Sequence, residues 1–395
     1  MMNNGAYIVS SVRTAVGKAK RGTLRNYRPE DMGAEVLKGA LGKVKGLEPA
    51  MVDDILMGCA MPEGEQGMNM ARLIALRAGF PDEVSAATVN RFCSSGLQTI
   101  AMATQSIMAG HAKIVMAGGT ESMSLVPMSG YFFSPHPEMA EKRPQAYLNM
   151  GITAENVARD YKISREDQDA YAYRSHSRAA DAIKQGRYEE EIIPLKVSET
   201  ISFNGKAEKR ETVFKTDEGP RADTSPDALS GLRPAFSPKG SVTAGNSSQM
   251  SDGSAATVVM SKAKMEELEL KPMARLLGFA TAGVAPEVMG IGPVKAIPKV
   301  LKQTGLKLAD IGLIELNEAF ASQTIAIVRE LGLDEERVNV NGGAIALGHP
   351  LGCTGAKLTA SLLHEMQRRG ERYGICTMCI GGGMGAAGVF ENMML

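Results

Sequence analysis

The protein has 395 residues, with 44 basic and 44 acidic side chains and a formal net charge of zero. It is 44% hydrophobic and 22% charged, which is typical of folded soluble proteins and excludes wholesale disorder. Its length predicts two or three domains. The neutral charge gives no electrostatic reason to bind nucleic acid or an anionic membrane, and five cysteines argue against a disulfide-rich secreted scaffold.

No stretch of the sequence is typical of a targeting signal or a membrane anchor. Residues 1–17 lack a basic region followed by an apolar core. The longest uncharged stretch, residues 92–112, is too rich in Ser, Thr, Gln and Gly for a membrane span. Residues 391–395 carry no lipidation cysteine or address. We therefore expect a cytoplasmic protein without a membrane span.

The chain repeats itself at an offset of 259 residues. This shift places Gly46-Leu47 on Gly305-Leu306 and Ser95-Gly96 on Thr354-Gly355. One constant offset over about 55 residues is hard to obtain by chance, so it indicates an internal duplication.

Each copy predicts a helix, a strand, a glycine-rich turn, a second helix and a second strand. The alternation of helices with short Val/Ile-rich strands predicts an α/β fold with buried, largely parallel sheets. Two such halves would pack face to face, and their equivalent loops would meet at a pseudo-symmetry axis, a natural place for a site. The expected elements, in chain order, are helix 32–44, strand 54–58, helix 94–109, strand 114–117, helix 294–303, strand 313–316, helix 354–369 and strand 374–378.

Residues 122–250 interrupt the repeat and are rich in Pro, Arg, Glu and Ser. We expect amphipathic helices over 153–159 and 166–185, the second capped by Ser164 with Asp167 completing a capping box. Residues 204–241 are expected to be a polar loop. We interpret the segment as an insertion that covers the site, and surface decoration is the alternative.

The first candidate for chemistry is Cys93, which lies where a strand-like stretch gives way to a helix. A helix N-terminus presents free N–H groups and a partial positive charge, which lower the pKa of a thiol and stabilise an oxyanion. Ser94, Ser95 and Gly96 leave room for a substrate. Taken alone, however, Cys93 is better explained as a buried structural cysteine.

The second candidate is His349, in a glycine-rich loop that precedes the helix of the second copy. The 259-residue shift equates His349 with Asn90, just before Cys93. A lone histidine is usually structural, but one placed by symmetry beside the loop of a nucleophile is better explained as a base.

The third candidate is Cys379, which ends a strand and opens a glycine run. Cys376 precedes it by three residues, a spacing that could suggest zinc or redox chemistry. Within a strand, however, this spacing points the two side chains to opposite faces, and no second Cys or His pair stands nearby. The sequence therefore predicts no metal site.

The fourth candidate is Asn317-Glu318, which directly follows the strand 313–316. A polar pair at the C-terminal end of a strand is where open α/β sheets meet their ligands. Asn317 could also cap the following helix, and both roles could hold. The remaining Cys and His side chains are interpreted as structural at Cys59 and Cys353, and as surface residues at His111, His136, His176 and His364.

The segments that contain these candidates resemble segments of the thiolases, and the resemblance extends along essentially the whole chain. The matching segments are 90–97, 317–320, 348–352 and 379–385. The resemblance implies duplicated βαβαβ halves in a five-layered α/β sandwich with an inserted loop domain. It implies an N-terminal half over 1–121 with 251–270, an inserted loop domain over 122–250 that covers CoA and substrate, and a C-terminal half over 271–395.

Within the thiolases, the sequence is most similar to the degradative 3-ketoacyl-CoA branch, in segments 93–95, 243–253 and 349–355. That branch cleaves 3-ketoacyl-CoA with CoA to acyl-CoA and acetyl-CoA, in fatty acid β-oxidation. Asn149 stands where the biosynthetic acetoacetyl-CoA branch usually has His. Three alternatives stay open: a biosynthetic acetoacetyl-CoA thiolase, a β-ketoacyl carrier-protein synthase and a non-catalytic binding subunit of an oxidation complex.

The resemblance also implies roles for the candidate residues. Cys93 resembles the nucleophile that becomes acylated, His349 the base that activates it, and Cys379 the acid/base that moves the proton on carbon. Asn317 resembles the residue that holds a water, which forms one oxyanion hole with His349. The backbone N–H groups of Cys93 and Gly381 resemble the second oxyanion hole.

Contacts with CoA and the acyl group follow from the same resemblance. Ser248 and Arg221 match positions that touch CoA, near the pantetheine and the nucleotide respectively. Met150 and Phe320 match positions that line the pocket. The resemblance implies no bound cofactor and no metal, with CoA as co-substrate and acyl-CoA as substrate.

We also expect a homodimer or a dimer of dimers, with a multifunctional β-oxidation subunit as a further candidate partner. Residues 84–90 and 114–119 are apolar, strand-like stretches that flank Cys93. An open sheet edge there would favour aggregation unless it were paired, and two-fold pairing of like edges is the commonest solution.

Overall fold

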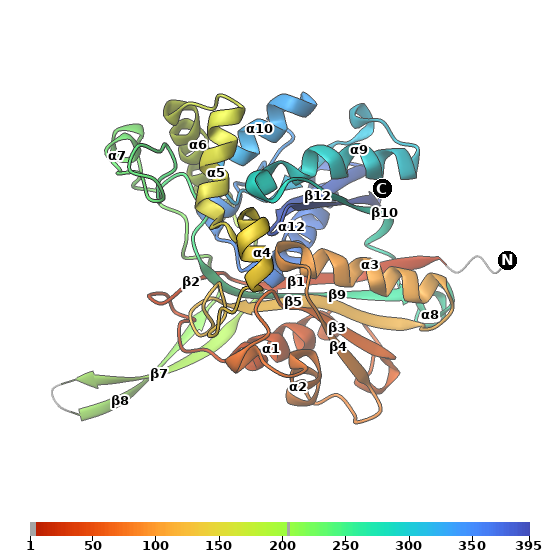
Figure 1. The fold of residues 1–395 in the computed structure, drawn as a ribbon. Coiled ribbons are helices and arrows are strands. Elements are labelled where there is room, and N and C mark those ends of the chain that lie inside the picture. The colour runs from red at the N-terminus through yellow and green to blue at the C-terminus, as the bar shows by residue number, and fades with distance from the viewer. Residues whose placement is uncertain (1–4, 204–205) are drawn as a thin grey trace.

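Alternating layers of helices and strands build the core of the protein (Figure 1). The computed structural model describes residues 5–203 and 206–395. Residues 1–4, in the stretch where we expected no signal, and residues 204–205, in the expected polar loop, lie outside this description. One continuous sheet of eleven hydrogen-bonded strands forms two sheet layers, which lie between three layers of helices, and one apolar cluster fills each helical layer. This arrangement confirms the expected five-layered α/β sandwich.

The first sheet has the strand order β4-β3-β5-β9-β1. Two helices, α1 (Pro29–Gly42) and α2 (Met70–Ala78), pack on its outer face, and α3 (Ser95–Met108) packs on its inner face. The strands are β1 (Ala6–Thr14), β3 (Asp54–Gly58), β4 (Ser85–Val89), β5 (Ile114–Ser122) and β9 (Ser251–Ser261), with the short β2 (Gly17–Lys18) on β9 and β6 (Ile192–Ile193) on β1. Helix α8 (Lys262–Glu267) follows β9.

The second sheet has the order β10-β13-β12-β11 and joins the first where Ile8 of β1 pairs with Ala274 of β10. Its outer face carries α9 (Gly292–Thr304) and α10 (Ala321–Leu331), and its inner face carries α12 (Thr354–Arg369). The strands are β10 (Ala274–Gly283), β11 (Leu313–Leu316), β12 (Tyr373–Ile380) and β13 (Met384–Asn392), and the short α11 (Ala344–Leu347) precedes α12.

The duplication predicted from the sequence is confirmed by these elements. In the first half β3, α3 and β5 begin at residues 54, 95 and 114, and in the second half β11, α12 and β12 begin at residues 313, 354 and 373, each 259 residues later. The pairing also repeats, because β3 runs parallel to β5 and β11 runs parallel to β12. Both halves then continue with antiparallel strands, β9 and β1 or β13 and β10.

The expectation of largely parallel sheets is wrong. Parallel pairing within the two sheets is confined to β3 with β4 and β5, β11 with β12, and the short β6 with β1, among the residues that the structure describes. The sequence argument found only the strands that flank helices, and these are the strands that crossover helices connect in parallel. It missed β1, β9, β10 and β13, which pair antiparallel.

The two halves meet where α3 and α12 cross in the middle helical layer. A Cβ atom added at Gly96 would lie 2.6 Å from the backbone nitrogen of Ala356, and one added at Gly355 would lie 2.3 Å from the backbone nitrogen of Leu97. Both positions therefore require glycine, because any side chain would separate the two backbones. This contact brings the N-terminal turns of α3 and α12 together, and with them the loops that carry Cys93 and His349.

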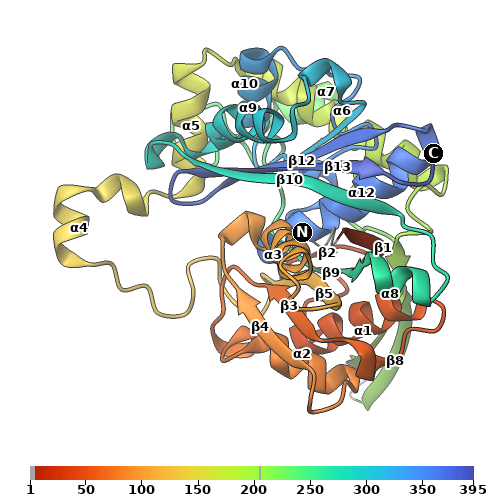
Figure 2. The same cartoon turned by 90° about the vertical axis from the view of Figure 1, so that its right-hand side faces the viewer.

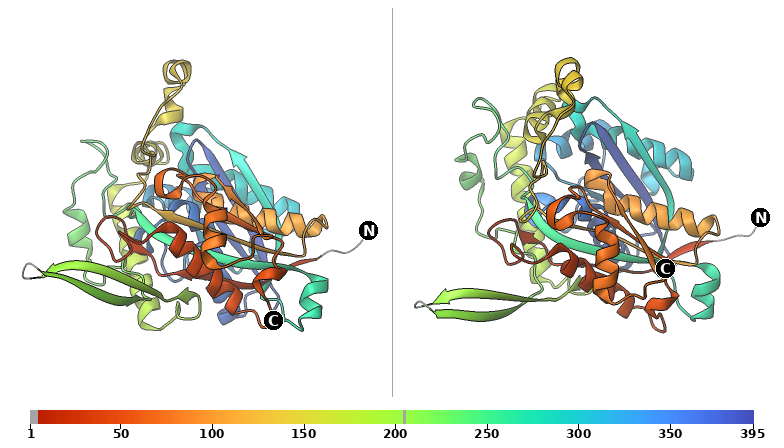
Figure 3. Two further views of the ribbon diagram at one scale, coloured as in Figure 1. Left: turned by 90° about the horizontal axis from the view of Figure 1, so that it is seen from below. Right: turned by 60° about the horizontal axis from the view of Figure 1, so that its bottom comes forward.

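The inserted segment contributes helices and one projecting hairpin. It holds α4 (Pro137–Lys142), α5 (Met150–Asp160), α6 (Arg165–Lys184), β7 (Leu195–Phe203), β8 (Lys206–Phe214) and α7 (Pro226–Ser230). Figure 2 shows that α4 lies away from the body of the protein, and Figure 3 shows that the β7–β8 hairpin also extends from this body. The two expected helices are confirmed as α5 and α6.

Two expectations for the insertion need correction. The stretch 204–241 is not a loop throughout, because it includes β8 and α7. Residues 207–213 of β8 are exposed on both faces, so no apolar alternation reveals this strand in the sequence. The hydroxyl of Ser164 caps α6 as expected by accepting from the N–H of Asp167 at 3.0 Å. The carboxylate of Asp167 instead accepts from Arg329 at 2.9 Å, so the capping box is incomplete.

Within residues 5–203 and 206–395, we find no helix that combines the length and the apolar character needed to cross a membrane.

Candidate active site

Cys93 lies in a strained turn at the start of α3. It belongs to a 3-10 turn over Phe92–Ser94, and Phe92 has a φ of +44°, an unfavourable value for a bulky residue. The hydroxyl of Ser95 holds this turn, because it accepts from the N–H of Arg91 at 2.9 Å and donates to the carbonyl of Phe92 at 2.6 Å. Strain of this kind persists only where surrounding contacts fix it, as they do here.

The thiol of Cys93 is buried, with a residue exposure of 7%. Burial raises its pKa to about 12, and hydrogen bonds from the backbone N–H groups of Gly381 and of Cys93 itself act in the opposite direction. These two N–H groups therefore converge on the sulfur. The resting side chain is a neutral thiol, and it needs a base to become a nucleophile.

His349 is held in the tautomer that a base requires. Its Nδ1 lies 2.6 Å from the hydroxyl of Thr354, and this hydroxyl donates its own proton to the carbonyl of Pro350 at 3.0 Å. With the hydroxyl donating to Pro350, Nδ1 carries the proton, and the lone pair of Nε2 accepts from Nδ2 of Asn317. Burial, with a smaller effect from the charge of Lys357, lowers the pKa of His349 to about 3, so the ring is neutral at physiological pH.

Asn317 lies beside this lone pair, with its Nδ2 3.3 Å from His349 Nε2. The residue is fully buried and immediately follows β11. Its Oδ1 has no hydrogen-bond partner within the described part of the chain. A buried carbonyl oxygen without a partner fits a place where water or a substrate group binds.

Cys379 lies at the end of β12 and is fully buried. Its sulfur is 3.6 Å from Oε1 of Gln323, on α10. Burial raises the pKa of the Cys379 thiol, and the neighbouring Cys93 raises it further. Cys376 packs instead in the core between the sheets, which confirms that the two cysteines face opposite ways.

An apolar cluster closes the site on the side of the insertion. Phe320 and Cys379 pack in one cluster, and Met150 packs against it from the start of α5. A Cβ atom at Gly381 would lie 2.7 Å from the terminal carbon of Met150, so Met150 touches the backbone that reaches Cys93. The structure thus brings Met150 and Phe320 to the two cysteines.

The two residues expected to contact CoA have different surroundings. Ser248 is half-buried, and its N–H donates to the carbonyl of Ala319 at 2.9 Å, beside Phe320. The side chain of Arg221 is 63% exposed and pairs with Asp223, at 3.4 Å. The structure places Ser248 next to the apolar cluster, whereas within residues 5–203 and 206–395 Arg221 forms no hydrogen bond or ion pair with the two cysteines or with His349.

Two expectations near the site are wrong. His176 is buried rather than exposed, and its Nδ1 accepts from the N–H of Arg221 at 3.1 Å. It lies on the inner face of α6, which its polar sequence neighbours did not reveal. Residues 114–119 are not at a sheet edge, because β5 lies between β3 and β9, whereas β4 is the edge strand of the first sheet.

Sequence reasoning missed the residues that hold the site in place. Thr354 contacts the ring of His349, and Gln323 contacts Cys379. Glu121 contacts the loop that follows His349. Glu121 is fully buried and accepts from the N–H groups of Ala60 and Gly352, both at 2.7 Å, so it joins the two halves beside the site. Only Thr354 left a signal in the sequence, because the 259-residue shift equates it with Ser95, which holds the Cys93 turn.

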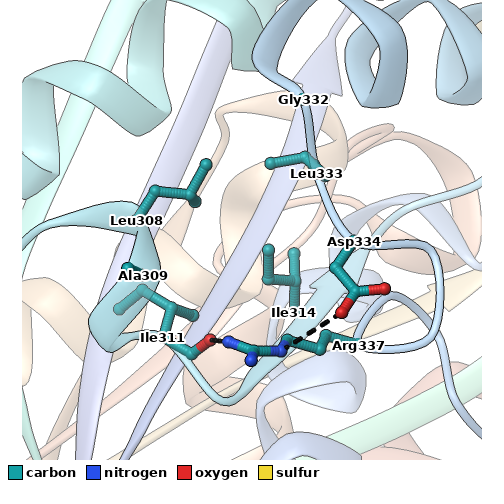
Figure 4. A pocket seen from close by; sticks show the side chains of 8 residues that line it. All are labelled: Leu308, Ala309, Ile311, Ile314, Gly332, Leu333, Asp334 and Arg337. Atoms are coloured by element: carbon teal, nitrogen blue, oxygen red, sulfur yellow. Dashed lines mark hydrogen bonds and ion pairs between the residues drawn. The ribbon is translucent and has the colours of Figure 1, made fainter.

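Among the described residues, no group of three His, Cys, Asp or Glu side chains could hold a metal ion. A cavity of about 250 Å³ lies elsewhere, near the C-terminal end of α10 (Figure 4). Leu308, Ile311 and Leu333 line it, and its charged residues, Asp334 and Arg337, pair with each other at 3.4 Å. This cavity has no nucleophile or base, so it does not compete with the Cys93 site.

Comparisons with known proteins agree with this site. The family models described as thiolase N-terminal domain and thiolase C-terminal domain match residues 6–263 and 270–392. A relative named 3-ketoacyl-CoA thiolase, from Bacillus subtilis, is 59% identical over 98% of this chain and 99% of its own. A relative named acetyl-CoA acetyltransferase, from Syntrophomonas wolfei, is 45% identical over 99% of this chain and 100% of its own.

A solved structure, the Bacillus anthracis acetyl-CoA acetyltransferase, superimposes with a TM-score of 0.90 at 42% identity, covering 98% of this chain and 99% of that one. Its coverage spans both halves and the insertion. The buried cysteines, the oriented histidine, the five-layered sandwich and these matches lead to one conclusion: the chain belongs to the thiolase family.

Proposed function

We propose that the protein is an acetyl-CoA C-acyltransferase that cleaves 3-ketoacyl-CoA with CoA, giving acyl-CoA and acetyl-CoA. The observation that supports this most strongly is that the turn of Cys93 packs against the turn that follows His349, with Cys379 beside Cys93. The sulfur of Cys93 receives two backbone N–H groups, and Nε2 of His349 keeps a lone pair that can accept a proton. A nucleophile, an acid and a base are the groups that this reaction needs.

The first half of the reaction acylates Cys93. His349 Nε2 takes the proton of Cys93, and the thiolate attacks the 3-keto carbon of the substrate. The bond between the second and third carbons then breaks, which leaves the acyl group on Cys93 and releases the enolate of acetyl-CoA. Cys379 gives its proton to the enolate carbon and becomes a thiolate.

The second half returns each proton. The thiol of CoA gives its proton to the Cys379 thiolate and attacks the acyl thioester on Cys93. When Cys93 leaves, it takes back the proton that His349 holds. Acyl transfer between two thioesters changes the free energy little, so this second half-reaction runs in both directions.

Two sets of donors stabilise the negative charge on oxygen. We propose the backbone N–H groups of Cys93 and Gly381 as one oxyanion hole, and His349 with a water held by Asn317 as the other. Backbone donors in a buried site are fixed before the reaction starts, so they lose little free energy to reorganisation. Met150 and Phe320 are proposed to line the acyl pocket, and Ser248 and Arg221 to contact CoA.

The biosynthetic direction is the second candidate, because one close relative and one solved structure carry the name acetyl-CoA acetyltransferase. Asn149 favours the degradative direction, since the short-chain branch usually has His there. Thiolytic activity against 3-ketoacyl-CoAs of increasing chain length separates the two. Activity that persists on longer chains supports our proposal, and activity confined to acetoacetyl-CoA supports the alternative.

We further propose a fatty acid β-oxidation role and a homodimer that pairs along the edge strand β4, with a dimer of dimers and a multifunctional β-oxidation subunit as further assemblies. The domain boundaries that we propose are 1–121 with 251–270, 122–250 and 271–395. We propose that nucleic acid is not a partner, because 44 basic and 44 acidic side chains give the chain no net charge. We also propose a cytoplasmic location.

A further inference from the structure

A buried lysine lies beneath the His349 loop. Lys357 is on the first turn of α12 and is 1% exposed. Within the described part of the chain, its single hydrogen bond goes to the main-chain carbonyl of Gly348, at 3.0 Å, and not to a carboxylate. Lysines are seldom fully buried unless they are paired, so a buried ammonium bound to a loop carbonyl calls for an explanation.

Lys357 acts on the residue that precedes His349. Gly348 has a φ of +93°, and a Cβ atom there would lie 2.2 Å from the hydroxyl of Ser251. The backbone at Gly348 therefore has little room to adopt another conformation, and the ammonium of Lys357 holds the Gly348 carbonyl in place. Thr354, three residues before Lys357 on the same helix, holds the His349 ring. One face of a single helical turn thus fixes both the backbone and the ring of His349.

The charged surroundings of Lys357 can sustain an ammonium group. Burial and the nearby Arg13 lower its pKa, whereas Asp217, Cys353 and Glu315 raise it. Arg13 itself forms ion pairs with Asp217 and Glu191, at 2.7 and 2.6 Å. Asp217 and Glu191 come from the inserted segment and offset the charge of Arg13 on β1, whereas burial raises the pKa of Glu315 on β11 well above its usual range.

The charge of Lys357 also reaches His349. After burial, it is the second cause that lowers the pKa of the imidazole. Glu121 is buried nearby and accepts from the N–H of Gly352, and Cys93 and Cys379 are neutral thiols. A positive charge disfavours the imidazolium ion, so it keeps Nε2 free to accept a proton.

We propose that Lys357 is a positioning residue for the base: it holds the Gly348 carbonyl, and its charge adds to the burial that disfavours the imidazolium form of His349. The proposal depends on the proposed function, in which His349 is the base. It assigns Lys357 no contact with the substrate. It predicts two separable effects, one from the hydrogen bond and one from the charge.

Three substitutions separate these effects. Lys357→Arg keeps both the charge and a donor, Lys357→Gln keeps a donor without the charge, and Lys357→Met keeps neither. If Lys357→Met fails to fold, Lys357→Gln still tests the charge. Thermal unfolding and circular dichroism establish which variants are folded.

The main measurement is the NMR signal of the His349 ring between about pH 4.5 and pH 7.5, without any substrate. The chain has five histidines, and His349→Gln identifies the signal by removing it. We expect the ring to stay neutral over this range in the wild type and in Lys357→Arg. In Lys357→Gln and Lys357→Met, protonation should begin one to two pH units higher, which is a 10- to 100-fold gain in proton affinity, on the order of a neighbouring charge.

The second measurement is the rate of Cys93 acylation at neutral pH. We expect kcat to fall by about 10-fold or more in Lys357→Met, with an unchanged KM, and to fall less in Lys357→Gln, which keeps the donor. Equal His349 titrations in the wild type and in folded Lys357→Gln would overturn the proposal. Because the NMR measurement needs no substrate, it can succeed even if the enzyme does not cleave 3-ketoacyl-CoA, so the two failures are distinguishable.

Discussion

The hydroxyl of Thr354 lies 2.6 Å from Nδ1 of His349 and holds the ring by this nitrogen. Ser95 stands at the equivalent place in the first half and holds the turn of Cys93 with its own hydroxyl. Both halves therefore have a hydroxyl side chain in the first turn of their central helix, and the two hydroxyls have different roles. In one half it fixes the nucleophile, and in the other half it fixes the base.

Thr354→Val should lower kcat by about 10- to 100-fold, because the ring can then rotate or adopt the other tautomer. Thr354→Ser keeps the hydroxyl and should recover most of the activity. Thr359→Val is the matched control, because Thr359 is also buried in α12 but its hydroxyl donates to the carbonyl of Gly355, at 2.8 Å, rather than contacting a ring nitrogen. If both valine variants lose activity equally, Thr354 has no special role.

Cys379→Ala should leave acylation of Cys93 by a simple acyl-CoA detectable and should slow carbon–carbon cleavage by about 10²- to 10⁴-fold. The reason is that Cys93 forms the thioester, while Cys379 moves the proton on carbon. Cys376→Ala is the control, since this buried cysteine of the same strand packs on the other face. Equal loss of both half-reactions in folded Cys379→Ala would contradict this division.

His176 should make the protein sensitive to acid. Burial, aided by the charges of Arg221 and Lys18, lowers the pKa of His176 to about 4, whereas an unfolded histidine titrates near 6.5. The unfolded chain therefore binds the proton first, and the stability that the neutral ring contributes is present above about pH 6.5 and lost as the pH falls towards 4.

We expect His176→Gln to gain stability relative to the wild type over this window, by up to about 2–3 kcal/mol. Urea unfolding at pH 7, 6 and 5 measures the difference. His111→Gln, at an exposed histidine, controls for the loss of one imidazole. Wild-type and His176→Gln curves that stay parallel at all three pH values would show that the ring does not take up a proton on unfolding.

Ala87→Arg should weaken dimer formation. Ala87 is exposed on β4, the edge strand of the first sheet, and a long charged side chain there opposes pairing between two edges. Light scattering at micromolar concentration should give a dimer for the wild type and a larger monomer fraction, near 42.0 kDa, for the variant. A stable, fully active wild-type monomer would show that the edge argument is wrong.

Much of this fold could be predicted because the internal repeat can be detected in the sequence alone. The 259-residue offset located β3, α3 and β5 together with their counterparts; Cys93 directly precedes α3, Asn317 directly follows β11, and Cys379 lies at the end of β12. Between these elements the offset no longer matches equivalent parts of the two halves. A shift of 259 residues would place β4 on α11, because the intervening loops differ in length between the two halves.

The supporting contacts of the site could not be predicted in the same way. Glu121 and Gln323 lie far along the chain from Gly352 and Cys379, and Lys357 lies nine residues from Gly348. The packing of the two halves brings Glu121 to its partner, and packing within the second half brings Gln323 and Lys357 to theirs. Each is a polar residue in an element that also has a core face, so its sequence context is that of an ordinary strand or helix. A buried polar residue becomes visible only when its partners are known.

Mass spectrometry of the protein after incubation with a 3-ketoacyl-CoA tests the central claim most directly. We predict one acyl group, attached to Cys93, and none on Cys93→Ser, because a serine hydroxyl is a far weaker nucleophile beside a neutral imidazole. The other four cysteines, Cys59, Cys353, Cys376 and Cys379, are buried and serve as internal controls. An acyl group on any of these four in the wild type, or acylation that survives in Cys93→Ser, would contradict the account.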